Sequence, residues 1–160
     1  MLELRPIEFL LRGLPEGFLV VFAIYIFSKT EIDKKKYLIT SIIFSLIIYI
    51  VRLLPISYGV HMILSLLILL LIIVSYNKID VIKGVKSIIL IYLLQLISEL
   101  INVFILNLMN IDLEVLSLNP VCKIILGFPS LIITAIIIYI VFIINKKERS
   151  YEINEFGSIK

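Results

Sequence analysis

The sequence predicts an all-α protein, a polytopic bundle of about five transmembrane helices. Of its 160 residues, 61% are hydrophobic, whereas a soluble domain is usually about 45–50% apolar. The Ile and Leu residues stand in long runs, and a helix needs about 20 such residues to cross the hydrocarbon core. Lys and Arg cluster at the ends of these runs, which is typical of topology signals in membrane proteins. We therefore expect a lipid bilayer as the main partner, and no nucleic acid.

Five apolar segments are expected to span the membrane. In chain order they are Ile7–Ser28, Tyr37–Leu54, Tyr58–Tyr76, Val85–Leu108 and Lys123–Asn145. Together they make residues 1–145 a transmembrane bundle, followed by a short cytoplasmic tail, residues 146–160, which is too short to fold alone. No removable signal peptide is expected, because no basic region precedes the first apolar run and no cleavage motif follows it.

Pro15 makes the first segment ambiguous. A proline either begins a helix at its first turn or kinks a longer one. In the first case residues 2–12 form a separate interfacial or re-entrant helix; we favour the second, a single kinked helix. In the fifth segment, Gly127 and Pro129 interrupt the first half, and Pro129 frees a backbone carbonyl that needs another partner.

The loops predict the orientation. Residues 29–36, the stretch that carries Lys78 and Lys83, and the tail from Lys146 lie on one side in a five-helix topology and hold most of the cations. The positive-inside rule places this side in the cytoplasm and the N-terminus outside. The stretch Asn77–Lys86 alternates Lys with Ile and Val, and we expect it to lie on the inner headgroup surface. The bias toward Ile and Lys indicates an AT-rich genome, so we expect a multi-pass protein of a bacterial plasma membrane.

Polar residues within the apolar segments are the candidates for a ligand-binding site. A charge at the centre of a transmembrane helix costs about 2.5–3.5 kcal/mol on insertion scales, so it needs a partner, water or a function. In the predicted topology these residues share the outer half of the membrane, where they would line an outward-facing pocket above an apolar inner seal. They are Arg12, Glu16, Arg52, His61, Gln95, Glu99 and Asn102.

Each of these residues also has a structural interpretation. The simplest role for Arg12 and Glu16, four residues apart on one helical face, is an intrahelical ion pair. Arg52 can extend to the outer headgroups, and His61 can be an ordinary packing residue. Glu99 has apolar neighbours in mid-segment, so it is either neutral or paired with Arg12 or Arg52.

One stripe of the fourth segment carries Gln95, Glu99 and Asn102, which are spaced by four and three residues. Gln95 and Asn102 fit interhelical hydrogen bonds. For Glu99, a bundle-holding role and a ligand- or proton-binding role both stay open.

The sequence offers little for catalysis. One His and one Cys cannot build a metal site alone, and Cys122 leaves no disulfide within the chain. No nucleotide-binding, metalloprotease or serine-hydrolase motif is present. We expect no enzyme activity and no cofactor.

The stretch Arg52–Leu64, RLLPISYGVHMIL, and the layout of short Ile-rich helices with lysine-rich inner loops resemble the membrane-sensor portion of AgrC-like, clostridial-type sensor histidine kinases. The sequence lacks their dimerisation helix, phosphoacceptor histidine region and ATP-binding domain. The resemblance therefore implies a sensor-like module without kinase activity, and no catalytic residue is carried over.

We expect a non-catalytic membrane sensor or regulatory protein that binds an extracellular small-molecule or peptide ligand and signals to a cytoplasmic partner. A substrate-binding subunit of a transporter and a structural or assembly protein are the alternatives. Because five spans have little interior of their own, we also expect a membrane protein partner or a homo-oligomer.

Overall fold

The computed structural model describes residues 9–54, 58–109 and 120–157. These residues form five α-helices and one π-helical turn, with no strand among them, which confirms the all-α membrane bundle. The elements are η1 (Phe9–Gly13), α2 (Leu14–Phe27), α3 (Lys34–Leu53), α4 (Tyr58–Ser75), α5 (Val81–Leu108) and α7 (Pro120–Gly157). Four helical segments are long and apolar enough to cross a membrane, and α4 supplies a shorter apolar helix, Gly59–Ser75.

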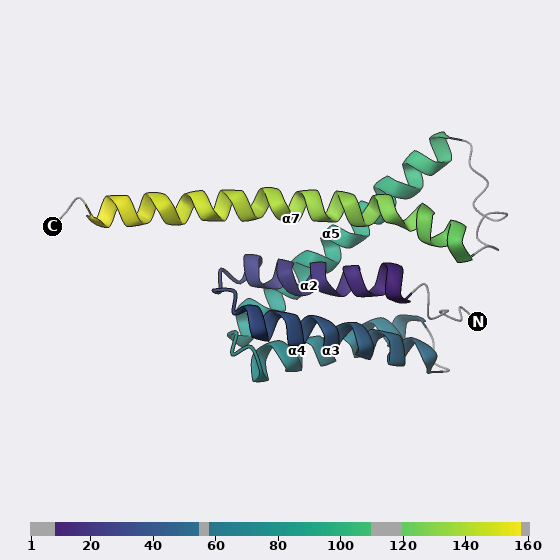
Figure 1. Cartoon of the computed structure of the whole chain (residues 1–160), viewed down its shortest axis with the longest axis horizontal. Helices are drawn as coiled ribbons and strands as arrows, with labels where there is room; N and C mark the ends of the chain where they lie inside the picture. The colour runs from purple at the N-terminus through teal and green to yellow at the C-terminus, as the bar shows by residue number, and fades with distance from the viewer. Residues whose placement is uncertain (1–8, 55–57, 110–119, 158–160) are drawn as a thin grey trace.

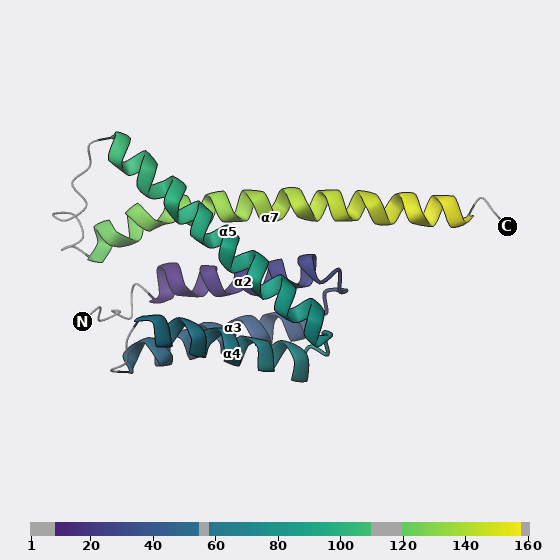
Figure 2. The same ribbon diagram turned by 180° about the vertical axis from the view of Figure 1, so that it is seen from behind.

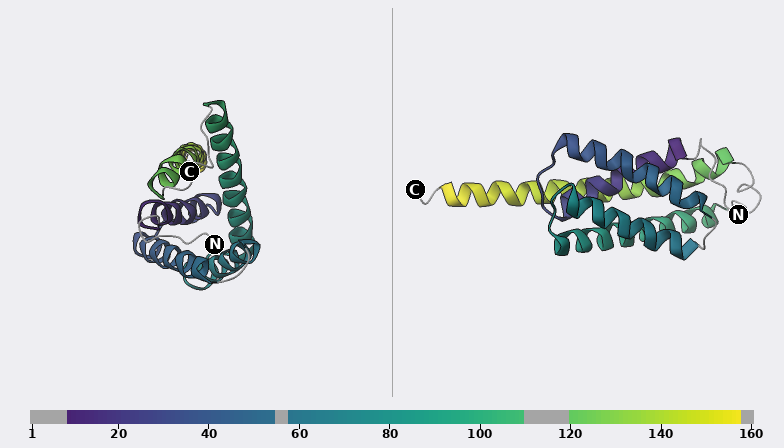
Figure 3. Two further views of the ribbon diagram at one scale, coloured as in Figure 1. Left: turned by 90° about the vertical axis from the view of Figure 1, so that its right-hand side faces the viewer. Right: turned by 90° about the horizontal axis from the view of Figure 1, so that it is seen from below.

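Helix α2 lies at the centre of the bundle. It packs against α3, α5 and α7. Helices α2, α3, α4 and α7 run side by side, whereas α5 crosses them obliquely (Figures 1 and 2). The end-on view shows α5 standing along one edge, so that it reaches from α4 to α7 (Figure 3). The buried core follows from this arrangement, because Val20 and Ile24 of α2 join Phe44, Leu69 and Ile138 from three other helices.

Small residues bring α2 and α3 close together. A side chain on Gly17 would collide with the Ser45 hydroxyl and meet the Ser41 carbonyl. The two serine hydroxyls donate to backbone carbonyls of their own helix, to Tyr37 O and Ser41 O, each at 2.8 Å. Close backbone approach through small residues is how helices associate where the surrounding lipid is as apolar as their side chains.

The lysine-bearing loops lie together at one end of the bundle (Figure 1). At this end Asp33 caps α3 by accepting from the Lys35 and Lys36 N–H groups at 3.0 and 3.3 Å. Asp80 caps α5 in the same way. Both caps satisfy backbone donors that a helix start leaves free. The common end is what the positive-inside argument requires, and the orientation itself stays a prediction.

The first segment is one continuous helical segment, as predicted, but the distortion within it differs from the predicted proline kink. Phe9–Phe27 is a single helical segment, with Pro15 in the first turn of α2. The distortion before Pro15 is the π-helical turn η1 rather than a simple kink. The predicted alternative helix, residues 2–12, lies largely outside the described residues.

Two other boundaries differ from the sequence expectations. Helix α5 begins at Val81, and both Asn77 and Ile79 before it are buried, so the surface location expected for this stretch is wrong at these two residues. Helix α7 does not end at Asn145 but continues to Gly157, for 38 residues in all. The predicted tail thus begins as an extension of the last helix, and it projects beyond the other helices (Figure 1).

Candidate functional site

An ion pair joins the π-helical turn η1 to helix α5. Arg12 Nη2 donates to Glu99 Oε1 at 3.1 Å. Of the two predicted partners for Glu99, Arg12 is therefore the one in contact. The Arg12 guanidinium also lies against Gly127 of α7, where any added Cβ would collide with it. Three elements, η1, α5 and α7, thus meet at one side chain.

A second link runs parallel to the first. Gln95 Nε2 donates to Glu16 Oε1 at 3.2 Å. Arg12 and Glu16 therefore both turn to α5, and the predicted intrahelical pair between them is wrong. The physical reason is local, because Arg12 lies in the π-helical turn η1, where bonding from i to i+5 changes the spacing on which an i, i+4 pair depends.

The third link reaches α7 near its proline. Asn102 Nδ2 donates to the Leu126 carbonyl at 2.7 Å, and Ser130 Oγ donates to Gly127 O at 2.8 Å. Both acceptors, Leu126 O and Gly127 O, lie in the turn before Pro129. The carbonyl that loses its helical donor to the proline is that of Ile125, four residues earlier. On the same face of α5, Asn102 Oδ1 and Ser98 Oγ are buried without a hydrogen-bond partner among the described residues.

The structure brings together five of the seven predicted site residues. Arg52, at the end of α3, is exposed, and within the described residues it makes no ion pair. His61 of α4 is half-buried, and its Nδ1 finds no partner in the part of the chain that the structure describes. We call these five residues the outer polar layer, after the side of the membrane on which they are expected. It consists of Arg12, Glu16, Gln95, Glu99 and Asn102.

The outer polar layer opens at the side of the bundle. The side chain of Glu99 is 62% exposed and that of Arg12 30% exposed. Glu99 lies within Val81–Leu108, a helix long and apolar enough to cross a membrane. In hydrocarbon, whatever covers Glu99 would decide how stable its charge is.

The sequence analysis missed a second polar cluster, at the lysine-rich end. Asn77 is 6% exposed, and its Oδ1 accepts from Tyr25 OH at 2.9 Å and from Thr40 Oγ1 at 3.1 Å. This contact ties α2, α3 and the α4–α5 connection together, so the seal predicted at this end is not wholly apolar. The residues are uncharged and lie at segment ends, where such side chains usually face water, so the sequence carried little signal for the contact.

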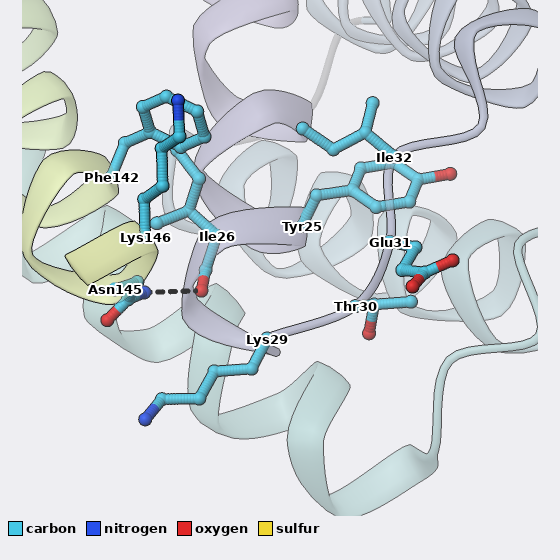
Figure 4. Close-up of a pocket in the computed structure, with 9 residues that line it drawn as sticks. All are labelled: Tyr25, Ile26, Lys29, Thr30, Glu31, Ile32, Phe142, Asn145 and Lys146. Carbon is cyan, nitrogen blue, oxygen red and sulfur yellow. Dashed lines mark hydrogen bonds between the residues drawn. The ribbon is translucent and has the colours of Figure 1, made fainter. Parts of the chain in front are cut away.

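A pocket of about 260 Å³ lies next to this cluster (Figure 4). It is bounded by the end of α2, the loop that follows and the stretch of α7 that carries Phe142, Asn145 and Lys146. Asn145 Nδ2 donates to Ile26 O at 3.0 Å across its floor. Among the described residues no group of three or more His, Cys, Asp or Glu side chains could hold a metal ion.

The bundle and its polar layer define a multi-pass α-helical membrane protein. No protein family, curated protein or solved structure matches the chain. The similarity to the AgrC-like sensor portion therefore rests on the sequence alone and stays a prediction.

Proposed function

We propose that the protein is a non-catalytic membrane sensor, in which an extracellular ligand acts on the outer polar layer and α7 carries the change to a cytoplasmic partner. One observation carries the proposal. The same continuous helix touches the Arg12 guanidinium at Gly127, bonds the end of α2 through Asn145 and extends to Gly157.

The contact at Gly127 makes α7 sensitive to the state of the Arg12–Glu99 pair. Because Gly127 has no side chain, the guanidinium lies directly on the helix, and any movement of one displaces the other. The neighbouring Pro129 supplies a place where α7 bends with little loss of hydrogen bonding, since prolines are the usual sites of helix kinks.

The chemistry of Arg12 suggests the class of ligand. A guanidinium offers five N–H donors in a planar fork that fits a carboxylate, and Glu99 takes only one nitrogen here. A carboxylate of a small molecule or peptide therefore competes with Glu99 for Arg12. Displacing Glu99 would release α5 from η1 and relax the contact with α7.

Transmission along α7 can be tested with one fluorescent residue, because the sequence contains no Trp. Phe142 packs against Phe22 of α2, with ring centroids 6.0 Å apart, at the inner end of α7. We expect Glu99→Gln to shift the emission maximum of a Phe142→Trp variant in nanodiscs. The matched control is Leu100→Ala. Leu100 follows Glu99 in α5 and is exposed, so this variant should leave the spectrum unchanged.

Identical spectra with and without Glu99→Gln would show that the inner end does not sense the polar layer, and would refute the proposal. Helical content measured by circular dichroism separates a transmitted change from unfolding, because only unfolding lowers it.

Assembly with another membrane protein is a second candidate function. The exposed Glu99 side chain favours it, because a protein surface would shield the carboxylate from hydrocarbon. In this case Glu99→Gln lowers the oligomeric fraction seen by light scattering in mild detergent, whereas Leu100→Ala does not.

A further inference from the structure

We infer that the exposed flank of α5 around Glu99 is the contact surface for a second copy of this chain, and that the two copies share their Arg12 and Glu99 side chains. This partner belongs to the assembly function given above as the second candidate, so the inference rests on that function and not on the sensor function. The exposure of the ion pair, its unused hydrogen-bonding capacity and its symmetry carry it.

The flank of α5 combines one charge with an apolar rim. Leu96, Glu99 and Val103 are spaced by three and four residues, so they share one side of the helix, and all three are exposed. Helix α5 crosses the bundle with no other described helix in front of it (Figure 2). Leu96 and Val103 are suited to lipid, whereas a carboxylate in an apolar segment usually faces protein or water. The ion pair, rather than the rim, therefore calls for a protein partner.

The ion pair has capacity for a second carboxylate. Arg12 carries five N–H donors in a planar fork, and it donates to Glu99 Oε1 through Nη2. One side of the guanidinium lies against Gly127, while the Arg12 side chain remains partly exposed. A second carboxylate that approaches from outside the bundle therefore meets donors that Glu99 does not use.

The pair is complementary to its own copy. Two copies with the same topology are related by a two-fold axis along the membrane normal, and such an interface brings the same patch of both subunits together. The pair joins η1 to the neighbouring helix α5, so it lies across the bundle rather than along it. A two-fold rotation reverses that direction, and Arg12 of each copy then faces Glu99 of the other. The four groups alternate in charge, whereas a patch of one sign would repel its copy.

Cysteine cross-linking of the full chain in liposomes tests the surface. In a Cys122→Ser background, Val103→Cys is expected to form a disulfide-linked dimer on oxidation. Ile101→Cys is the matched control, because Ile101 is also exposed but lies about 200° away around the same helix. Equal cross-linking at the two positions would overturn the assignment of the surface.

Charge exchange tests whether the pair is shared. Glu99→Arg places two cations in each copy and Arg12→Glu places two anions, so each variant alone is expected to be monomeric. A mixture of the two restores opposite charges only between copies, and it is expected to give a mixed dimer in native mass spectrometry. Absence of the mixed dimer, when the wild type dimerises, would overturn the shared pair.

Glu99→Gln replaces the charge exchange if either variant does not insert. It is expected to weaken the dimer on the order of tenfold, whereas Leu100→Ala leaves the dimer affinity unchanged. Equal affinity in Glu99→Gln and the wild type would overturn the shared pair.

The second copy and the assembly function fail in different ways. A wild-type chain that is monomeric in liposomes overturns the second copy as partner. If a complex with a different membrane protein is then isolated and Glu99→Gln dissociates it, the assembly function stands without self-association. If Glu99→Gln dissociates neither kind of complex, both fail.

Discussion

Arg12 Nη2 and Glu99 Oε1 lie 3.1 Å apart although 87 residues separate them in the chain. The contact closes the bundle between its first helical segment and α5. Each charge reaches the membrane interior on its own helix, and each has the other as its ionic partner among the described residues. Their stabilities are therefore coupled, and this coupling can be measured.

A double-mutant cycle measures the coupling directly. We expect Arg12→Met and Glu99→Leu each to lower the free energy of unfolding, because each leaves a lone charge at membrane depth. The double variant should lose less than the sum, by about 1–2 kcal/mol. Unfolding in mixed micelles, followed by circular dichroism, gives all four values. Strict additivity would mean that the contact contributes nothing.

Gly127→Ala tests the same pair without altering either charge. An added methyl group would occupy the space of the Arg12 guanidinium, so Arg12 must move away from Glu99. We expect a loss of about 1–3 kcal/mol, in the range for overpacked sites, by the same unfolding assay. The loss should disappear when Arg12→Ala is present. If it persists in that background, the damage arises elsewhere in α7.

Gly17→Ala should separate α2 from α3. Its methyl group would collide with the Ser45 side chain, and we expect a loss of about 1–3 kcal/mol. Gly84→Ala is the matched control, because an added Cβ there makes only ordinary contacts with Leu70 and Ile73. Adding Ser45→Gly should recover part of the stability of Gly17→Ala. Thermal unfolding of these three variants and the wild type decides, and equal effects at the two glycines would contradict the prediction.

Asn77→Ala should destabilise the lysine-rich end. It leaves the Tyr25 and Thr40 hydroxyl groups without their acceptor, and a buried polar group without a partner costs about 1–3 kcal/mol. Tyr25→Phe removes only one of the two bonds, so its effect should be smaller. Hydrogen exchange of backbone amides near Asn77 measures both. Faster exchange in Tyr25→Phe than in Asn77→Ala would refute this order.

Cysteine labelling tests the orientation. In a Cys122→Ser background, Lys34→Cys and Lys83→Cys should react with a membrane-impermeant maleimide only after bacterial cells are permeabilised. Leu54→Cys, at the other end of α3, should react in intact cells. This pattern follows from the excess of lysine in cytoplasmic loops, and the reverse pattern would invert the topology.

The helices were predictable because their signal is summed over many residues. A run such as Val85–Leu108 can cross a membrane whatever its neighbours do, and α5 covers all of it. The starts of α3 and α5 were not predicted: Asp33 and Asp80 cap them about one turn before the predicted segments begin at Tyr37 and Val85. The interior of α7 was equally clear, but its C-terminal end was not, because charged residues after Asn145 are compatible with both a loop and a helix in water.

The contacts between helices were only partly predictable. Spacing placed Gln95, Glu99 and Asn102 on one face, and the structure confirms that all three make interhelical bonds. Which residue Arg12 would contact depended on the π-helical turn around it, a feature without a sequence signature. The buried Asn77 cluster depended on three elements meeting, and none of its residues carries a charge that demands a partner.

The length of α7 would turn a small bend into a large displacement of its far end. From Pro129 to Gly157 the helix extends about 42 Å at about 1.5 Å per residue. A change in direction of about 5° at Pro129 would therefore sweep the far end through about 4 Å, most of one helical turn. In the proposed mechanism, α7 would act as a lever whose short arm lies beside Arg12 and whose long arm ends outside the bilayer.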